Sequence, residues 1–455
     1  MNESVELPVW LLVVVLALAA IAALDRIIGP GVRWYLRRRM ERVVARLNTR
    51  LQRPIEPFRL ARRKDTVTRL SYDPRVLEAV AEHAAETGVP PSVAFAEAEG
   101  YAREIVPGFS ASLYFGFATR AARWLSRFLY RVRIGRIDAA LAHIDPRSTV
   151  IFVMNHRSNM DYVLITWLVA ERTSLSYAVG EWARVWPLSG LIRSMGAFFI
   201  RRNSKNPLYR RVLARYVQIA TSEGTTQAMF PEGGLSLDGR VGAARMGLLS
   251  YILAGFDPAG RDVVFVPVGL AYDRVLEDRL LTEAAAAGTR RFRARPLSIA
   301  AFVARMFWRR LRGRFHGFGT VAAGFGAPLS LRAWVAKAPD RSAEALGDDL
   351  MARIGRAVPV VPVPLVAAAV ALGPVARADL PARVQAMAAR LQAQGAVLAL
   401  PREGDAAEAG VVPLIARGIL AEGPDGLVAR DMALHAFYAA AVLQMLDEDA
   451  ATPQT

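Results

Sequence analysis

Short apolar runs alternate with segments of helical periodicity in the middle of the chain. The apolar runs lie at residues 149–154, 196–200, 226–230, 263–270 and 319–325. The segments with helical periodicity lie at residues 161–171, 208–222 and 242–254. Such runs are typical of buried strands, and strands that alternate with helices are typical of an α/β sandwich. We therefore predict an α/β domain with a mixed or mostly parallel sheet at residues 141–338.

Helical patterns flank this domain on both sides. Residues 32–140 are rich in arginine and form a basic helical region. Residues 339–455 return to helices after the proline-rich segment 358–364. The apolar run 365–375 that follows is too short to span a bilayer, so we expect it to be a packed helix.

Residues 1–31 have the pattern of a membrane anchor. The stretch Leu7–Leu24 carries no charge and is long enough to cross a hydrocarbon core of about 30 Å as an α-helix. A cleaved signal peptide is the alternative, but such peptides begin with a basic segment, whereas Glu3 and Glu6 make this one acidic. Residues 26–64 contain thirteen basic residues and two acidic ones. This bias predicts an N-terminus outside the cell and a cytoplasmic remainder.

The composition agrees with a protein that associates with membranes. Apolar residues make up 53% of the chain and the mean hydropathy is +0.23, which is high for a soluble enzyme. The net charge of +17 also fits nucleic-acid binding. However, the basic excess lies beside the predicted span and at residues 290–314, where arginine alternates with aromatic residues. This arrangement favours anionic lipid headgroups over nucleic acid.

The residue types also limit the chemistry. The chain has no cysteine, which excludes thiol catalysis and a thiolate zinc site. None of its five histidines has a second histidine at ligand spacing on one helix, so we expect no metal centre. Most of the basic residues are arginines, so a single arginine indicates phosphate binding only where a motif places it.

The most informative motif follows the apolar run at residues 149–154. It contains His156 and Asp161. Five helical residues turn by about 500°, so these side chains would not share one helix face and must lie across a strand-to-helix turn. An imidazole with a carboxylate partner can then act as a general base. One alternative is that the pair only caps a helix. A serine nucleophile at Ser158 is another, although no G-x-S-x-G elbow is present.

Three later segments place charged residues or glycines after apolar, strand-like runs. They are residues 196–202, 229–236 and 263–274. Together with residues 149–161, and in this order, they resemble the four acyltransferase blocks of the glycerolipid acyltransferase superfamily. The resemblance is greatest to its glycerol-3-phosphate acyltransferase branch. It implies the acyltransferase α/β sandwich, flanked here by the two helical regions and one N-terminal transmembrane helix.

The resemblance also implies roles for individual residues. His156 would be the catalytic base, and Asp161 would orient it. The expected substrate-binding residues are Arg157, Arg201, Arg202, Glu232, Gly233, Gly234, Arg240 and Pro267. The arginines would hold a phosphate through guanidinium forks, Glu232 and the two glycines would bind glycerol hydroxyls and an anion, and Pro267 would border the acyl chain.

One position departs from the family pattern. Leu235 stands where the family usually has arginine. This removes one expected phosphate contact, and Arg240 in the following turn is placed to compensate. The departure leaves room for a different acceptor.

The implied activity is transfer of a fatty acyl group from a thioester to the sn-1 hydroxyl of glycerol 3-phosphate. The product would be lysophosphatidic acid, for phospholipid biosynthesis, made at the cytoplasmic side of the inner membrane by a single-pass protein. Acylation of lysophosphatidic acid at sn-2 and a non-catalytic membrane scaffold are the alternatives. No metal or cofactor is expected, and acyl-CoA and acyl carrier protein both remain open as donors. The expected partners are these substrates and membrane lipid, without nucleic acid.

Overall fold

The computed structural model divides the chain into two compact units, Met1–Ile55 and Glu56–Thr455. It describes residues 8–447 except for 12, 17–37, 39–41, 43, 136, 171, 181–187, 202–203, 290–295, 314, 316, 338–341 and 402–404. Most of the predicted span, residues 7–24, lies outside the described residues. Within the described parts, no helix is both long enough and apolar enough to cross a bilayer.

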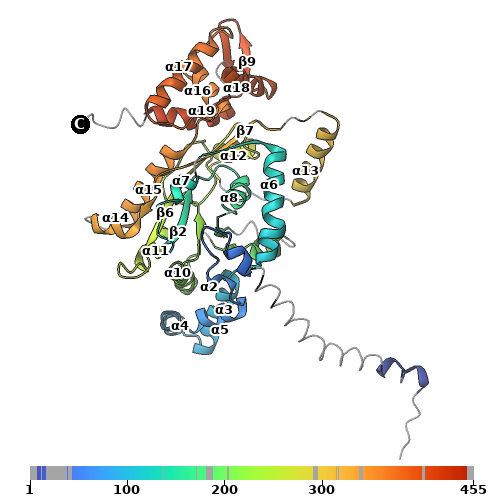
Figure 1. Cartoon of the computed structure of the whole chain (residues 1–455), viewed down its shortest axis with the longest axis vertical. Helices are drawn as coiled ribbons and strands as arrows, with labels where there is room; N and C mark the ends of the chain where they lie inside the picture. The colour runs from blue at the N-terminus through green and yellow to red at the C-terminus, as the bar shows by residue number, and fades with distance from the viewer. Residues whose placement is uncertain are drawn as a thin grey trace, which may run out of the picture. The chain divides into compact units, whose positions relative to one another are not determined.

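A mixed sheet forms the centre of the second unit (Figure 1). Its strands run in the order β1-β7-β6-β2-β5-β3-β4, and β8 also pairs with β6. Their bounds are β1 (Arg131–Ile134), β2 (Thr149–Met154), β3 (Ser176–Val179), β4 (Phe198–Phe199), β5 (Gln227–Met229), β6 (Val263–Tyr272), β7 (Thr320–Phe325) and β8 (Leu329–Ser330). Strands β7 and β8 are antiparallel to β6, and the other pairs are parallel. The predicted α/β fold with a mixed sheet is confirmed, although β1 lies in the region expected to be helical.

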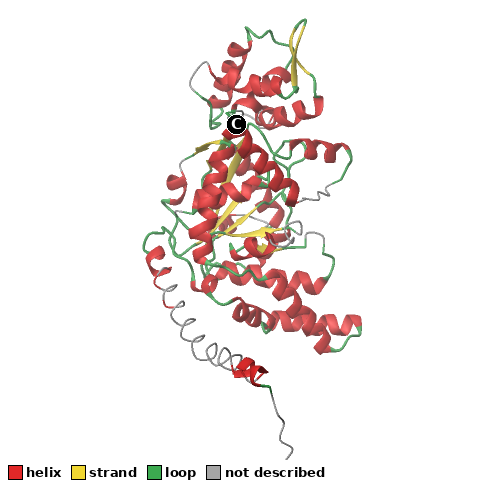
Figure 2. Cartoon of the chain, turned by 90° about the vertical axis from the view of Figure 1, so that its right-hand side faces the viewer, coloured by secondary structure: helices red, strands yellow, loops and turns green. Residues whose placement is uncertain are grey.

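Helices cover both faces of this sheet, as Figure 2 shows. Strand β2 illustrates the cause, because successive side chains of a strand point to opposite faces. Val150 and Phe152 enter one apolar core, whereas Ile151 and Val153 enter the other. The helices before the C-terminal part are α2 (Pro57–Leu60), α3 (Arg63–Ser71), α4 (Pro74–Thr87), α5 (Pro91–Ile105), the π-helix η1 (Leu113–Ala118), α6 (Thr119–Leu129), α7 (Ile137–Leu141), α8 (Met160–Val169), α9 (Leu188–Ser194), α10 (Pro207–Ser222), α11 (Gly247–Ala254), α12 (Asp278–Ala286), α13 (Pro296–Leu311), α14 (Leu331–Lys337) and α15 (Ala343–Ala357).

The C-terminal part of the second unit is a helical group with one hairpin. It consists of α16 (Pro362–Ala371), α17 (Leu380–Ala393), α18 (Asp405–Ala416), α19 (Met432–Asp447) and the antiparallel strands β9 (Leu420–Gly423) and β10 (Gly426–Ala429). Helix α16 is buried from Pro362 to Val370 and contacts the other three helices. The packed helix predicted at residues 365–375 is confirmed as far as Ala371, where α16 ends. The hairpin differs from the helical prediction, since Gly426 with a φ of 118° permits a tight turn between two short strands.

Candidate active site

The predicted base lies at the carboxyl edge of the sheet. Strand β2 ends at Met154, helix α8 begins at Met160, and His156 lies in the turn between them. Asn155 fixes this turn to the neighbouring strand β6. Its side-chain amide donates to the Leu270 carbonyl (3.0 Å), and its side-chain oxygen accepts from the Leu270 N–H (2.8 Å).

His156 and Asp161 form the pair that their spacing predicts. The His156 Nδ1 lies 2.9 Å from the Asp161 Oδ2. This oxygen also accepts from the backbone N–H groups of Arg157 (2.7 Å) and Ser158 (3.0 Å), while Oδ1 accepts from the Tyr272 hydroxyl (2.6 Å). A carboxylate can only accept, so Nδ1 carries the proton and Nε2 keeps its lone pair. The arrangement is therefore suited to general base catalysis.

The pair is enclosed by protein. The exposed fractions of the His156 and Asp161 side chains are 2% and 0%. The Phe230 ring stacks on the imidazole at 4.0 Å, and the Tyr162 ring meets it edge-on at 5.4 Å. Electrostatic interactions are stronger in such a site than in water, because less solvent screens them.

The Ser158 hydroxyl is bonded to groups other than the His156 imidazole. Its hydroxyl donates to the Glu277 carboxylate (2.7 Å) and accepts from the Met160 N–H (3.1 Å). The same carboxylate accepts from the Asn159 backbone and side chain. Burial raises the pKa of Glu277 above its ordinary value. These bonds give Ser158 a structural function in the turn, and no described bond joins it to His156.

Glu232 binds the turn between β2 and α8, which contains His156 and which we call the catalytic turn. Glu232 follows β5, and its two carboxylate oxygens accept from the backbone N–H groups of His156 (2.9 Å) and Gly242 (3.3 Å). Burial raises the pKa of Glu232 to about 7. The sequence predicted that this carboxylate binds glycerol hydroxyls, whereas both of its oxygens here hold main-chain groups. Glu232 therefore positions His156 in this structure.

The glycines after Glu232 allow a tight turn. Gly233 has a φ of 68°, and a Cβ added there would lie 2.7 Å from the Arg245 side chain. Gly234 is buried. The turn continues to Ser236, whose N–H donates to the His156 carbonyl (2.9 Å). The segment 232–242, which we call the acid loop, thus contacts the catalytic turn through both its acid and its main chain.

Arg201, one of the two predicted phosphate residues, lies on a strand connection away from the base. Arg201 follows β4, which lies three strand positions from β2, or about 14 Å. Its Nε and Nη2 donate to the Glu104 carboxylate of α5 (2.9 and 2.6 Å), and its guanidinium lies over the ring of Tyr101 at 5.2 Å. Glu104 raises the pKa of Arg201. Arg202 lies outside the described residues.

Arg157 follows His156 directly and contacts the acid loop, and Arg240 is part of that loop. The Arg157 guanidinium is buried and donates to the Gly239 carbonyl. Burial lowers the pKa of Arg157, and the Glu232 carboxylate acts in the opposite direction. Arg240 is exposed, and its N–H donates to the Asp238 carboxylate (3.0 Å). Arg157 therefore helps to hold the loop, whereas the Arg240 side chain extends from its surface.

Apolar packing explains two further positions. Leu235 packs against the apolar core beside β2, so the site where the family usually has arginine is filled by hydrocarbon. Pro267 is buried inside β6, where it pairs in register with Val153 of β2. It lies between the part of β6 that pairs with β8 and the part that pairs with β7. Its missing N–H therefore costs no strand pairing there.

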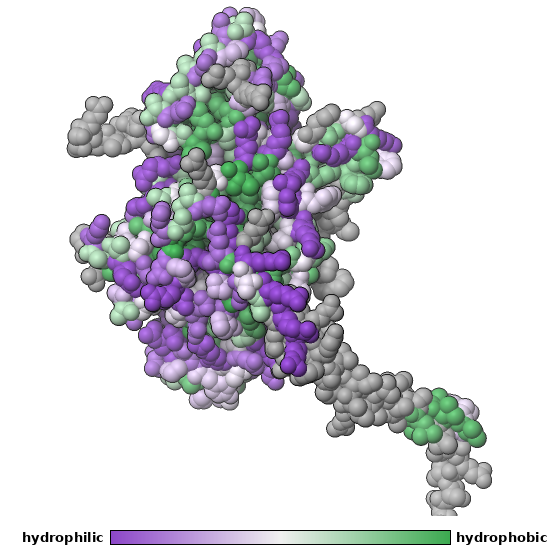
Figure 3. Space-filling model, in the orientation of Figure 1, coloured by the Kyte–Doolittle hydropathy of each residue, from purple (hydrophilic) through white to green (hydrophobic). Residues whose placement is uncertain are grey.

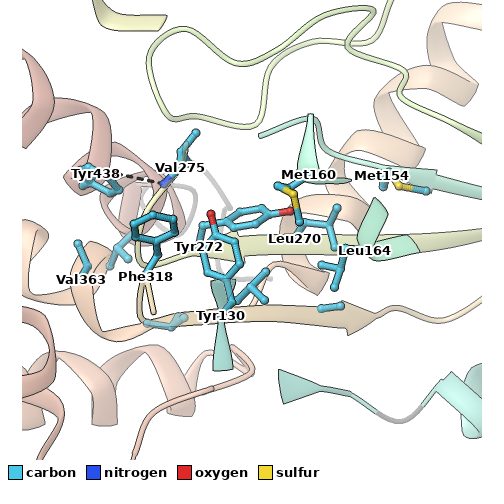
Figure 4. Packing of buried hydrophobic residues seen from close by; sticks show 14 of the residues in the cluster. Tyr130, Met154, Met160, Leu164, Leu270, Tyr272, Val275, Phe318, Val363 and Tyr438 are labelled. Carbon is cyan, nitrogen blue, oxygen red and sulfur yellow. Dashed lines mark hydrogen bonds between the residues drawn. The ribbon is translucent and has the colours of Figure 1, made fainter. Parts of the chain in front are cut away.

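Helix α19 holds the acid loop from outside the sheet. The Gln444 side chain accepts from the Val241 N–H (2.8 Å) and donates to the Val241 carbonyl (3.1 Å). A Cβ at Gly239 would lie 1.8 Å from the Phe437 carbonyl oxygen, so only glycine permits this close approach. In Figure 4 the Tyr438 hydroxyl reaches the Val275 N–H, just after β6, over 3.2 Å. Sequence reasoning missed these contacts, because no local motif marks Gln444 or Tyr438.

We predict that Gln444→Ala lowers kcat about tenfold, because the variant loses two hydrogen bonds that fix the acid loop. A tenfold lower rate corresponds to an activation free energy that is about 1.4 kcal/mol higher. The KM values should change little, because the Gln444 side chain is hydrogen-bonded to the Val241 main chain. Gln444→Glu keeps the bond to the Val241 N–H and should recover part of kcat. Steady-state kinetics would check this, with Gln392→Ala on α17 as the exposed glutamine control. An unchanged kcat would contradict a positioning role.

The central part of the chain is similar to one known family. An acyltransferase family model matches residues 137–271, the segment that holds β2, β3, β4, β5 and most of β6. The matched segment contains His156, Asp161 and Glu232. Tyr272, which also donates to Asp161, is the next residue of the chain.

Two relatives of this chain are named glycerol-3-phosphate acyltransferase. A glycerol-3-phosphate acyltransferase from Pseudomonas entomophila is 34% identical over 225 residues, covering 48% of this chain and 27% of the relative. Another from Pseudomonas fluorescens strain SBW25 is 30% identical over 294 residues, covering 63% and 34%. The chain thus spans about a third or less of the length of these relatives. The predicted resemblance to the glycerol-3-phosphate acyltransferase branch is confirmed.

A solved structure is also similar to part of the chain. It is the 1-acyl-sn-glycerophosphate acyltransferase from Thermotoga maritima, with 20% identity, covering 51% of this chain and 78% of that one. The TM-score is 0.30, which is too low to carry an argument about the fold.

Proposed function

We propose that this chain is a glycerol-3-phosphate O-acyltransferase. It transfers a fatty acyl group from a thioester to the sn-1 hydroxyl of glycerol 3-phosphate and forms lysophosphatidic acid. The observation that carries the proposal is the buried His156–Asp161 pair at the carboxyl edge of the sheet. The relatives named glycerol-3-phosphate acyltransferase support the choice of acceptor.

The reaction follows from the geometry of the pair. As the acceptor oxygen attacks the thioester carbonyl carbon, His156 Nε2 takes the hydroxyl proton, and Asp161 stabilises the imidazolium that forms. The tetrahedral oxyanion collapses, the carbon–sulfur bond breaks, and the imidazolium returns the proton to the leaving thiolate. The products are an ester and a free thiol, so no metal or redox cofactor enters the balance. Acyl-CoA or acyl carrier protein would serve as co-substrate.

Acylation of lysophosphatidic acid at sn-2 is the second candidate. The observation that favours it is Leu235, which packs against the core at a position where the family usually has arginine. Labelled acyl-CoA and acyl carrier protein thioester, each supplied with glycerol 3-phosphate or lysophosphatidic acid, would separate the candidates. Product from lysophosphatidic acid alone would favour sn-2 acylation. No turnover with either acceptor would favour a membrane scaffold.

We also propose that residues 7–24 anchor the chain in the inner membrane with the acyltransferase domain in the cytoplasm. The support is the uncharged stretch and the thirteen basic residues at positions 26–64. Deletion of residues 1–25 should leave the protein on anionic membranes through the remaining basic residues, with release only at high salt. Membrane flotation at low and high salt would check this. Release of the truncated protein at low salt would contradict the second, electrostatic anchor.

A further inference from the structure

Two helical segments of the second unit expose large aromatic side chains. On η1 and α6, Phe117 and Trp124 have exposed fractions of 58% and 52%. On α13, the exposed fractions are 46% for Phe307, 55% for Trp308 and 64% for Leu311. Single exposed apolar residues are common, but a group of them on one surface indicates an interaction site.

Ring contacts place these residues on one continuous surface. The Phe128 ring stacks on Trp124 at 5.2 Å and meets Phe307 at 6.3 Å. The Arg310 guanidinium lies over the same ring at 5.4 Å. Phe117 lies in the π-helix η1, which continues directly into α6, seven residues before Trp124. Figure 1 shows α6 and α13 at the same side of the sheet, and Figure 2 turns this side toward the viewer.

The charged residues of these two helices are all arginines. Helices α6 and α13 contain six arginines and no acidic residue: Arg120, Arg123, Arg127, Arg305, Arg309 and Arg310. Arg312 follows α13, and its guanidinium lies over the Trp308 ring at 4.9 Å. In Figure 3, hydrophilic and hydrophobic residues alternate over α13. We call the five exposed apolar residues and these seven arginines the aromatic–arginine face.

We propose that the aromatic–arginine face binds the surface of a bilayer that contains anionic phospholipid. Tryptophan and phenylalanine rings favour the headgroup level, and arginine stems can lie along apolar surface while the guanidinium groups reach phosphates. Each basic residue near an anionic surface contributes about 1 kcal/mol. The contact is separate from the N-terminal anchor and does not depend on which acceptor the enzyme uses.

The aromatic–arginine face is connected to the active site through packed rings. From Phe128, the ring contacts continue through Phe315 and Phe318 to Tyr130, with centroid distances of 5.7, 4.9 and 5.9 Å. Tyr130 contacts Tyr272 at 5.6 Å, and Tyr272 donates to the catalytic carboxylate. Figure 4 shows Tyr130, Phe318 and Tyr272 side by side. A bilayer on this face would therefore contact helices that pack, through these rings, against the residue that donates to Asp161.

The absence of cysteine makes a site-specific test possible. A polarity-sensitive fluorophore would be attached to full-length Trp308→Cys, and to Val412→Cys on α18 as a control with 47% exposure. Both would be reconstituted into phosphatidylcholine vesicles with or without phosphatidylglycerol. We expect the probe at position 308 to shift to the blue and to be quenched by brominated lipid when phosphatidylglycerol is present. The probe at position 412 should stay in water.

Charge reversal provides the second part of the test. Arg309→Glu with Arg312→Glu should abolish the shift at position 308, whereas Arg356→Glu with Arg390→Glu, at exposed sites on α15 and α17, should keep it. A probe at position 308 that stays in water with phosphatidylglycerol would overturn the proposal. So would an equal shift in phosphatidylcholine alone. A shift in detergent that grows with protein concentration would instead assign the face to a second copy of the chain.

Discussion

Replacement of His156 with alanine is expected to lower kcat by about 10² to 10⁴-fold, while the protein stays folded. The alanine variant has no group that can accept the hydroxyl proton, and the buried Asp161 loses its imidazole partner. Acyl transfer to glycerol 3-phosphate in purified membranes would measure kcat. Thermal unfolding of the same preparation would show that the fold is kept.

Two further variants test Asp161, the hydrogen-bond partner of His156, and one of the bonds that hold it. Asp161→Asn keeps the shape of the side chain, but its amide can donate to Nδ1 and so favour the tautomer with a proton on Nε2; we expect a loss nearly as large. Tyr272→Phe removes one of the four hydrogen bonds to Asp161 and should cost much less. If His156→Ala or Asp161→Asn kept more than about a tenth of kcat, the mechanism proposed here would be wrong.

The apolar pattern predicted the centre of the sheet well, because buried strands need continuous apolar residues. The run at residues 149–154 is β2, and the run at 263–270 is all but the end of β6. The strands β1, β3 and β8 of this sheet were not predicted. β1 is an edge strand with the sequence Arg-Val-Arg-Ile, and three of its four residues are exposed, so its pairing with β7 rather than its own composition makes it a strand.

The contact between His156 and Asp161 could be predicted because the two residues are close in sequence. The contacts of Glu232 could not, because its oxygens accept from His156 and Gly242 only after β5 has paired beside β2. The same holds for Arg201, whose partner Glu104 is 97 residues away. Motif spacing reports which residue types gather at a sheet edge. Long-range hydrogen bonds decide which of them remain available to a substrate.

The second large effect is expected on the KM for glycerol 3-phosphate, in variants that lack a ligand of the acceptor phosphate. If Arg201 binds it, Arg201→Ala should raise the KM for glycerol 3-phosphate about 10 to 100-fold, since a charge-assisted hydrogen bond contributes about 1.5 to 3 kcal/mol. The KM for the acyl donor should change far less. Arg201→Lys should recover only part of the loss, because an ammonium keeps the charge without the planar fork. Arg202→Ala and Arg240→Ala test the other candidates in the same assay.

The ion pair with Glu104 makes this test sharper. Both oxygens of that carboxylate accept from the Arg201 guanidinium, so a phosphate has to compete with it. Glu104→Gln keeps the side-chain shape but removes the competing charge, and we expect a lower KM for glycerol 3-phosphate if Arg201 is a phosphate ligand. If Arg201 only ties β4 to α5, both Arg201→Ala and Glu104→Gln should lower the unfolding temperature and leave this KM unchanged. If Arg202→Ala and Arg240→Ala also left the KM for glycerol 3-phosphate unchanged, none of these arginines would bind the acceptor phosphate. That outcome would favour acylation of lysophosphatidic acid.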